Sequence, residues 1–150
     1  MRVDLVSEQD LAELLPLVRG YCDFYEVTPS DAELLALSQA LIADPEREGV
    51  QLIARNEDGN AIGFATVYWS WATSRAKRIG VMNDLFVAAE ARGSGAAEAL
   101  IEACRDQCRR RGAGRLSWQT APDNERAQRV YDRIGATKEQ WLDYWLSAEP

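Results

Sequence analysis

The stretch from Asn83 to Glu102 reads NDLFVAAEARGSGAAEALIE, and it decides the fold. The apolar triplet at residues 85–87 predicts the end of a strand, and the glycines that follow predict a tight loop. The apolar spacing after the loop predicts a helix. A strand, a glycine loop and a helix N-terminus in this order form an anion site, because the first N–H groups of a helix lack acceptors and the helix dipole is positive there.

The glycine loop, residues 92–97, suits a phosphate in particular. Gly93 and Gly95 lack the side chains that would hold a phosphate away from the backbone. Ala96 and Ala97 keep the first turn of the helix thin. We therefore interpret the loop as a pyrophosphate site, around which the rest of the chain builds a sheet and a substrate pocket.

Composition and charge narrow the class of protein. A chain of 150 residues with 47% hydrophobic and 27% charged residues fits one globular domain. The formal net charge of -7 argues against a nucleic-acid-binding surface and favours cationic partners. We see no signal peptide and no stretch that is long and apolar enough to span a membrane. The three cysteines, an odd number, indicate reduced thiols and a cytoplasmic protein.

The absence of histidine limits the chemistry. It excludes a Ser-His-Asp or Cys-His catalytic unit. Because the commonest metal ligand is also missing, we expect no metal site. Any general base must be a carboxylate, a tyrosine, a water or a backbone group.

Hydrophobic periodicity places the elements. Alternating and apolar runs predict strands at residues 2–6, 50–55, 61–71, 78–87, 115–120 and 139–146. Helical spacing predicts helices at residues 11–25, 31–42, 96–111 and 124–134, the first of them kinked or broken at Pro16. Strands 78–87 and 115–120 should run parallel, because a right-handed helical crossover connects them.

Two groups of aromatic residues have more than one interpretation. Around Tyr25 and Glu26, the aromatic side chains belong either to the core or to the wall of a pocket for a cationic substrate. Trp69 and Trp71 lie on one face of their strand, where they act as sheet cover, as a dimer surface or as a substrate wall that binds cations by cation–π contact.

Two motifs resemble the signatures of the GNAT superfamily of acyl-CoA N-acyltransferases. Residues 92–97 resemble the pattern Q/R-x-x-G-x-G/A, directly after a strand ending in the apolar triplet. Residues 124–131, NERAQRVY, resemble the second signature, N-x-x-A-x-x-x-Y. The order of elements matches along essentially the whole chain. Residues 83–87 and 131–136 look most like the spermidine/spermine acetyltransferase-like branch of small-amine enzymes.

The resemblance implies an α/β (α+β) fold over a single domain of residues 1–150. The GNAT sheet is mixed and largely antiparallel, with six to seven strands, a parallel splayed central pair and about four flanking helices. Acetyl-CoA is implied as the co-substrate and a small-molecule amine as the partner, with no nucleic acid and no membrane. We also expect a homodimer, because the last predicted strand is rich in aromatic residues.

The resemblance also implies how the cofactor binds. The loop amides would take the pyrophosphate, and the backbone of the apolar triplet would pair with the pantetheine amides as an added strand does. Asn124 would bind the cofactor arm. The implied cofactor-binding residues are Leu85, Phe86, Val87, Arg92, Gly93, Ser94, Gly95, Ala96, Ala97 and Asn124.

The implied chemistry needs an acid and a base. Tyr131 stands where the family has its general acid, and a phenol with a pKa near ~10 is protonated at neutral pH. The family often places a glutamate on the central strand, where this chain has Val81 and Asn83, with Asp84 on the opposite parity. Asp84 acts through a water or is a structural carboxylate. Glu26 is a second candidate for binding the cation.

Three functions therefore compete. The first is an N-acetyltransferase for a small amine or amino acid, in a closed acidic pocket. The second is a protein-lysine or N-terminal acetyltransferase, which needs an open groove. The third is a non-catalytic acyl-CoA-binding module. A Rossmann dinucleotide site is disfavoured, because Glu98 stands where the third small residue of G-x-G-x-x-G/A belongs.

Overall fold

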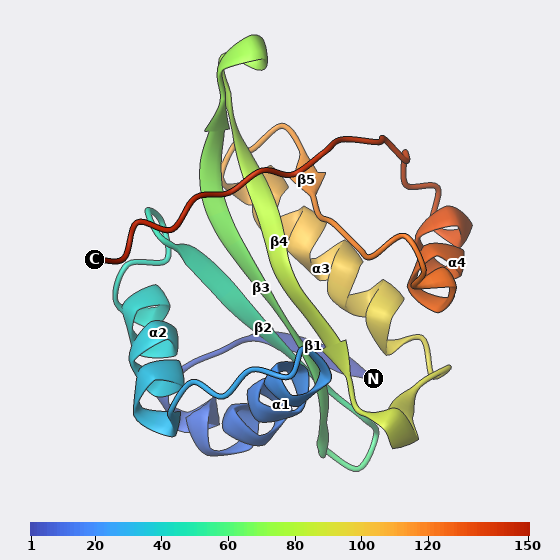
Figure 1. The fold of residues 1–150 in the computed structure, drawn as a ribbon. Helices are drawn as coiled ribbons and strands as arrows, with labels where there is room; N and C mark the ends of the chain where they lie inside the picture. The colour runs from blue at the N-terminus through green and yellow to red at the C-terminus, as the bar shows by residue number, and fades with distance from the viewer. The chain divides into compact units, whose positions relative to one another are not determined.

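The computed structural model describes all residues from 1 to 150, in two compact units, Met1–Gln119 and Thr120–Pro150. The first unit holds a sheet and three α-helices, and the second holds one helix (Figure 1). In chain order the elements are β1 (Arg2–Leu5), η1 (Glu8–Asp10), α1 (Leu11–Phe24), α2 (Asp31–Ala43), β2 (Gly49–Arg55), β3 (Ala61–Ala72), η2 (Thr73–Arg75), β4 (Lys77–Val87), η3 (Ala89–Ala91), α3 (Ala96–Arg110), β5 (Leu116–Ser117) and α4 (Glu125–Arg133).

The five strands form one sheet in the order β1-β2-β3-β4-β5. Neighbouring strands are antiparallel except β4 and β5, which are parallel. The largely antiparallel sheet with one parallel pair is thus confirmed, and so are the four helices. The expectation that this pair is central is wrong, because β5 is the edge strand of the sheet. The expectation of six to seven strands is wrong, because the sheet has five. The last of them, β5, is much shorter than the strand predicted at residues 115–120.

The strand predicted at residues 139–146 does not form. A strand exists only where a neighbour pairs with its backbone, and this segment pairs with none. Its large side chains are mostly in solvent: the exposed fractions are 81% for Trp141, 89% for Tyr144 and 84% for Trp145. The prediction of a strand at residues 139–146 rested on aromatic content, and it is wrong because no strand of the sheet pairs with this segment.

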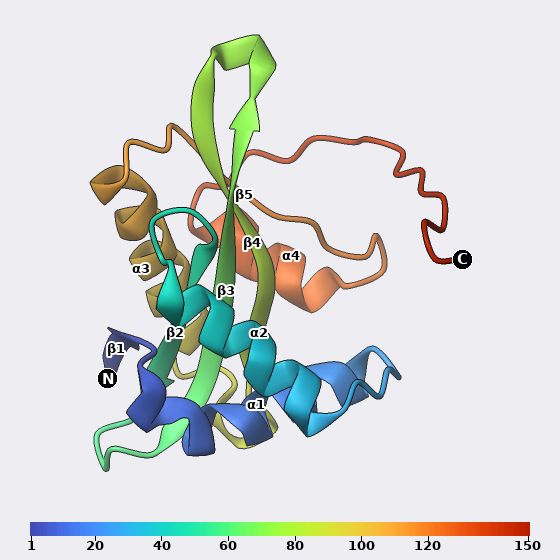
Figure 2. The same cartoon turned by 90° about the vertical axis from the view of Figure 1, so that its left-hand side faces the viewer.

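Helices α1 and α2 cover one face of the sheet, and α3 covers the other (Figures 1 and 2). On the first face, leucines of α1 at helical spacing pack against Ile53 of β2 and Phe64 of β3 in one buried cluster. Helix α1 also lies directly on β4, since a Cβ added at Gly20 would be 2.8 Å from the Phe86 ring. The helix runs through Pro16 without a break.

On the second face, α3 buries Leu100, Ile101, Cys104 and Cys108, as its spacing predicts. The helix approaches β4 closely, because a Cβ added at Gly80 would be 2.6 Å from the Cys108 sulfur. Burial raises the pKa of the Cys104 and Cys108 thiols, so both stay protonated packing groups.

Local signals fix the helix ends. The Ser30 N–H donates to the Glu33 carboxylate at 2.7 Å, and the Glu33 N–H donates to the Ser30 hydroxyl at 3.2 Å. This is the capping box that the sequence predicts at the start of α2. After α3, Gly112 has a φ of 68°, a left-handed conformation that suits glycine at the end of a helix. None of the helices has the length and apolar character needed to cross a membrane.

Candidate active site

The glycine loop joins β4 to α3, as predicted. Gly93 and Gly95 have φ values of 81° and 86°, which a residue with a side chain adopts only at a cost. A Cβ added at either glycine would meet nothing within 4 Å, so space is open above the loop backbone. Gly95 is the N-cap of α3 and offers no side-chain cap to the first turn.

Two of the loop amides are already used. The Arg92 N–H donates to the Ala89 carbonyl and the Ser94 N–H to the Ala91 carbonyl, both at 3.3 Å. The N–H groups that remain for an anion are those of Gly93, Gly95, Ala96 and Ala97. They gather at the positive end of the α3 dipole, which is where a pyrophosphate is best stabilised.

Beside the loop, one edge of β4 has no strand partner. The ladder between β4 and β5 consists of Gly80 with Leu116 and Val81 with Ser117, and then it ends. From residue 82 to residue 87, β4 pairs only with β3. The backbone of the apolar triplet, Leu85–Val87, thus lies along an open edge that an extended chain of amides can join.

A β-bulge interrupts β4 just before this triplet. Met82 lies opposite Val67 and Asp84 lies opposite Thr66, so Asn83 is an extra residue in β4. A bulge of this kind shifts the side-chain alternation by one position. The parity assigned to Asp84 from the sequence is therefore wrong. Asp84 lies on the same face of the sheet as Val81, beneath α1.

Asp84 is the centre of a polar cluster that also contains Asn83, Tyr21 and Tyr68. The Asn83 side-chain amide donates to the Asp84 carboxylate at 2.9 Å, and the Tyr21 hydroxyl donates to the Asn83 carbonyl at 3.2 Å. Burial, the charge of Asp84 and a hydrogen bond to Asp84 raise the pKa of Tyr21. Burial and the same charge raise the pKa of Tyr68 to about 12. Both phenols are neutral at physiological pH.

The end of α1 extends this Asp84 cluster. The Tyr25 ring packs on the Tyr21 ring with 4.9 Å between centroids, and on Phe24 with 5.1 Å. Tyr25 and Phe24 are mostly exposed. Glu26 follows with a φ of 56°, in the left-handed region, and its side chain lies in solvent. The structure thus brings the predicted residue Tyr25 into the neighbourhood of Asp84 through Tyr21.

Trp69 is not part of this neighbourhood. On β3 its side chain alternates with those of Thr66 and Tyr68, so it faces α3 on the other side of the sheet. Its indole N–H donates to the Pro45 carbonyl at 2.8 Å. The Arg78 and Arg111 guanidinium groups lie 5.7 Å and 5.3 Å from its ring centre. Trp69 therefore contacts cations of its own chain.

The second motif lies in the second unit. Asn124 is the N-cap of α4, and its side-chain oxygen accepts the Ala127 N–H at 3.2 Å. Tyr131 lies in α4, and its carbonyl accepts the Ala136 N–H at 3.0 Å. The helix ends before Gly135, whose φ of 77° is the left-handed cap that the sequence predicts.

The sequence does not predict Tyr68 as a site residue, and it predicts Tyr21 only as part of the aromatic helix end around Tyr25 and Glu26. Tyr21 stands four residues before Tyr25, so the two share one face of α1. Tyr68 stands two residues after Thr66, so the two share one face of β3. The register of β3 against β4 shows that Tyr68 faces Asp84, and the hydrogen bond from the Tyr21 hydroxyl to the Asn83 carbonyl shows that α1 brings Tyr21 there.

The fold is that of a known family. The model of the acetyltransferase (GNAT) family matches residues 14–136. An uncharacterized N-acetyltransferase of Bacillus subtilis, YhfO, is 33% identical over 135 residues, which is 90% of this chain and 89% of YhfO. The chain therefore belongs to the acetyltransferase (GNAT) family.

Solved structures agree with this family. A probable acetyltransferase superimposes with a TM-score of 0.86 and 28% identity, covering 100% of this chain and 99% of that one. A ribosomal-protein-alanine N-acetyltransferase from Brucella melitensis biovar Abortus 2308 gives a TM-score of 0.77 and 26% identity, covering 98% of this chain and 99% of that one. In the present structure, no three His, Cys, Asp or Glu side chains gather as a metal site would require.

Proposed function

We propose that this chain transfers an acetyl group from acetyl-CoA to a primary amine of a small molecule, either a polyamine-like amine or an amino acid. One observation carries the proposal. The bulge at Asn83, the open edge of β4 and the glycine loop follow one another within about 15 residues, so a thioester, a pantetheine arm and a pyrophosphate would find their sites in that order.

In this proposal the cofactor lies along β4. The four free amides at Gly93, Gly95, Ala96 and Ala97 hold the pyrophosphate, and the Leu85–Val87 backbone pairs with the pantetheine amides. This places the thioester near the bulge and hence near Asp84. Membership of the family supports acetyl-CoA as the co-substrate. The proposal also treats the two units as one catalytic domain, in which Asn124 binds the cofactor arm.

The Asp84 cluster is the proposed acceptor site. A primary amine with a pKa near ~10 is mostly protonated at neutral pH, so it must lose a proton before it attacks. The Asp84 carboxylate takes this proton, directly or through a water. Tyr21 and Tyr68 stay neutral and position the carboxylate, while Tyr25 and Glu26 line the approach of a cation.

The transfer then proceeds in two steps. The amine nitrogen forms a bond with the thioester carbonyl carbon, and a backbone N–H of β4 stabilises the oxyanion. When the intermediate collapses, the nitrogen gives its second proton to water, the carbon–sulfur bond breaks and the thiolate leaves with the electron pair. Tyr131 gives the thiolate its proton, and its place in the second family motif supports this role.

A thiol-release assay with acetyl-CoA tests the function. The acceptor panel contains spermidine, amino acids, a lysine peptide and a peptide with an N-terminal alanine. We expect turnover on the free amine or amino acids, and a loss of about 100-fold or more in kcat for Asp84→Asn and Tyr131→Phe with the Kd of acetyl-CoA unchanged.

Other outcomes would contradict the proposal. Turnover on the alanyl peptide alone would make this chain an N-terminal acetyltransferase, which its similarity to the ribosomal-protein-alanine enzyme favours. Binding of acetyl-CoA without turnover on any acceptor would make it an acyl-CoA-binding module. Unchanged kcat in Tyr131→Phe would contradict the role of that phenol.

A further inference from the structure

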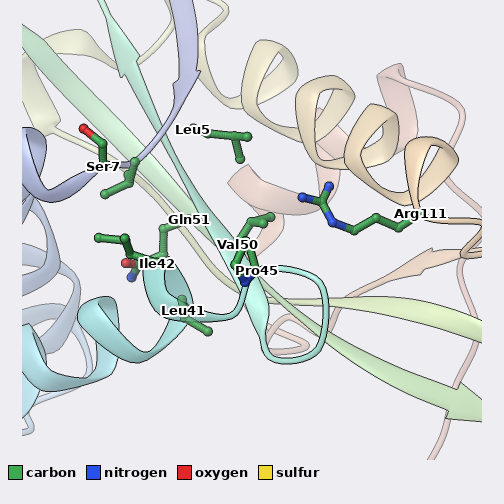
Figure 3. A pocket seen from close by; sticks show the side chains of 9 residues that line it. Leu5, Ser7, Leu41, Ile42, Pro45, Val50, Gln51 and Arg111 are labelled. Atoms are coloured by element: carbon green, nitrogen blue, oxygen red, sulfur yellow. The ribbon is translucent and has the colours of Figure 1, made fainter.

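A cavity of about 170 Å³ lies in the first unit, between the end of β1, the C-terminal end of α2 and the start of β2 (Figure 3). Its walls are mostly apolar: Leu5, Val6, Leu41, Ile42, Pro45 and Val50. The glycine loop is elsewhere, because it precedes α3 whereas Arg111, which lines the cavity, follows the last residue of that helix. A helix of 15 residues separates the two by about 22 Å.

The Arg111 guanidinium group at this cavity has an N–H donor without a partner. Its side chain is 10% exposed and points towards Val50 and Pro45 (Figure 3). Nη1 donates to the Gln107 side-chain oxygen, and Nη2 pairs with a Glu46 carboxylate oxygen at 3.0 Å. The buried Nε has no partner. The N–H groups of Nε and Nη2 point the same way, so together they form the fork that binds a carboxylate with two hydrogen bonds.

The charges around the cavity favour an anion. None of the lining residues is acidic. Arg78 and Arg111 both lie against the Trp69 ring, and Arg78 also donates to the Glu46 carbonyl at 2.7 Å. The Glu46 carboxylate is the negative charge beside these two arginines. Its side chain is 69% exposed, so it is able to turn away into solvent.

A second buried polar atom without a partner belongs to Gln51, but it is an acceptor and so needs a donor such as water rather than a carboxylate. The Gln51 side-chain oxygen is buried and has no partner, while its nitrogen donates to the Thr66 hydroxyl at 3.2 Å. Buried polar atoms without protein partners are normally satisfied by ordered water, so this part of the cavity is polar enough to hold solvent. The cavity volume equals that of about five or six liquid water molecules, which is enough for a chain of about six carbons.

We propose that this cavity is a second ligand site, which binds a short apolar carboxylate. The carboxylate accepts from Nε and Nη2 of Arg111 and displaces Glu46 from Nη2. The hydrocarbon tail packs on Leu5, Leu41 and Val50. This second site is separate from the acetyl-CoA site and from the acceptor site at Asp84, so the proposal does not depend on the proposed function.

Calorimetric titration with sodium hexanoate tests the site. We expect binding that is at least tenfold weaker for acetate, which lacks the tail, and for 1-hexanol, which lacks the charge. Saturating coenzyme A should leave the hexanoate Kd unchanged. Equal affinity for hexanol, competition by coenzyme A or no binding of hexanoate would each overturn the proposal.

Variants locate the ligand. Arg111→Lys keeps the charge and loses the fork, and we expect at least a tenfold loss of hexanoate affinity. Arg110→Lys is the matched control on the exposed neighbour and should leave the Kd unchanged. Glu46→Gln removes the competing carboxylate and should tighten binding severalfold. It also keeps Arg111 intact, so it tests the proposal even where Arg111→Lys lowers stability. Unchanged affinity in both Arg111→Lys and Glu46→Gln would contradict the site.

Discussion

The surroundings of Asp84 are determined by residues that lie near it in space, not by its neighbours in the sequence. In the sequence, an aspartate between Asn83 and Leu85 carries no signal of function. The bulge turns it beneath α1, where Tyr21 and Tyr68 face its charge. Both phenols have raised pKa values, so they remain neutral hydrogen-bond donors beside a carboxylate at physiological pH.

Tyr21 should therefore matter for turnover. Tyr21→Phe removes the hydroxyl that hydrogen-bonds the bulge and the carboxylate, and we expect kcat/KM for the amine to fall about tenfold, with the Kd of acetyl-CoA unchanged. Tyr25→Phe is the matched control, because Tyr25 contacts the cluster through its ring. Steady-state kinetics at several amine concentrations measure both. An equal loss in the two variants would assign the effect to packing.

A second residue-scale prediction concerns Asp10 and stability. Asp10 pairs with Arg55 at 2.8 Å, and their side chains are 19% and 8% exposed. Burial raises the pKa of Asp10, but the hydrogen bonds from Ser7 and Arg55 together lower it by more, so the net shift of the pKa is downward. The stabilisation is therefore complete above the ordinary aspartate pKa of about 3.9 and is lost as the pH falls through the lowered value.

We expect Asp10→Asn to lower the free energy of unfolding by about 2 kcal/mol at pH 7, because it leaves the buried Arg55 without its nearest charge partner. The difference from the wild type should shrink below pH ~4. Urea titrations at several pH values measure this difference in the free energy of unfolding. The control is Asp58→Asn, which changes an exposed aspartate in a turn. A difference independent of pH would show that the charge of Asp10 contributes nothing.

At the scale of the element, the glycine loop is the part most directly predicted from sequence. Its signal is local: two glycines that need positive φ, then a run of good helix formers. The strands and helices of the first unit were predicted by the same kind of local reasoning. The bounds of most elements agree within one residue, β5 is much shorter than predicted, and α1 is not broken at Pro16.

The rest of the site depends on register, which sequence alone does not reveal. The alternation from Val81 to Phe86 contains no sign that Asn83 is extra, so Asp84 was assigned to the wrong face. The same register hides Tyr68, whereas the contact of Tyr21 with the Asp84 cluster depends on how α1 packs on β4. The strand at residues 139–146 failed because pairing requires a neighbour, and aromatic content does not supply one.

The loop prediction has a matched control in the chain. Gly95→Ala places a methyl group over the proposed pyrophosphate site and strains a φ of 86°, and we expect the Kd of acetyl-CoA to rise at least tenfold. Gly59→Ala strains the same φ of 86° in the hairpin turn, also with nothing within 4 Å of the added carbon. Calorimetry should find that the Kd of acetyl-CoA for Gly59→Ala is the same as for the wild type. Equal weakening in both variants would attribute the effect to stability.

At the scale of the whole molecule, we expect a homodimer. The segment 139–146 exposes five large apolar side chains, and a monomer seldom leaves so many in water. Sedimentation equilibrium should give twice the chain mass, and Trp141→Ser with Trp145→Ser should shift the protein to monomers. Phe24→Ser, an exposed aromatic position on α1, is the control and should leave the mass unchanged. A wild-type monomer at all concentrations would contradict this expectation.

The central claim is that acetyl-CoA lies along β4 with its pyrophosphate on the amides of the glycine loop. Titration of the ¹⁵N-labelled protein with coenzyme A, followed amide by amide in NMR spectra, tests this claim most directly. We predict the largest shift changes at Gly93, Gly95, Ala96 and Ala97, then at residues 85–87. Undisturbed loop amides at saturating coenzyme A, or the largest changes at another surface, would contradict it.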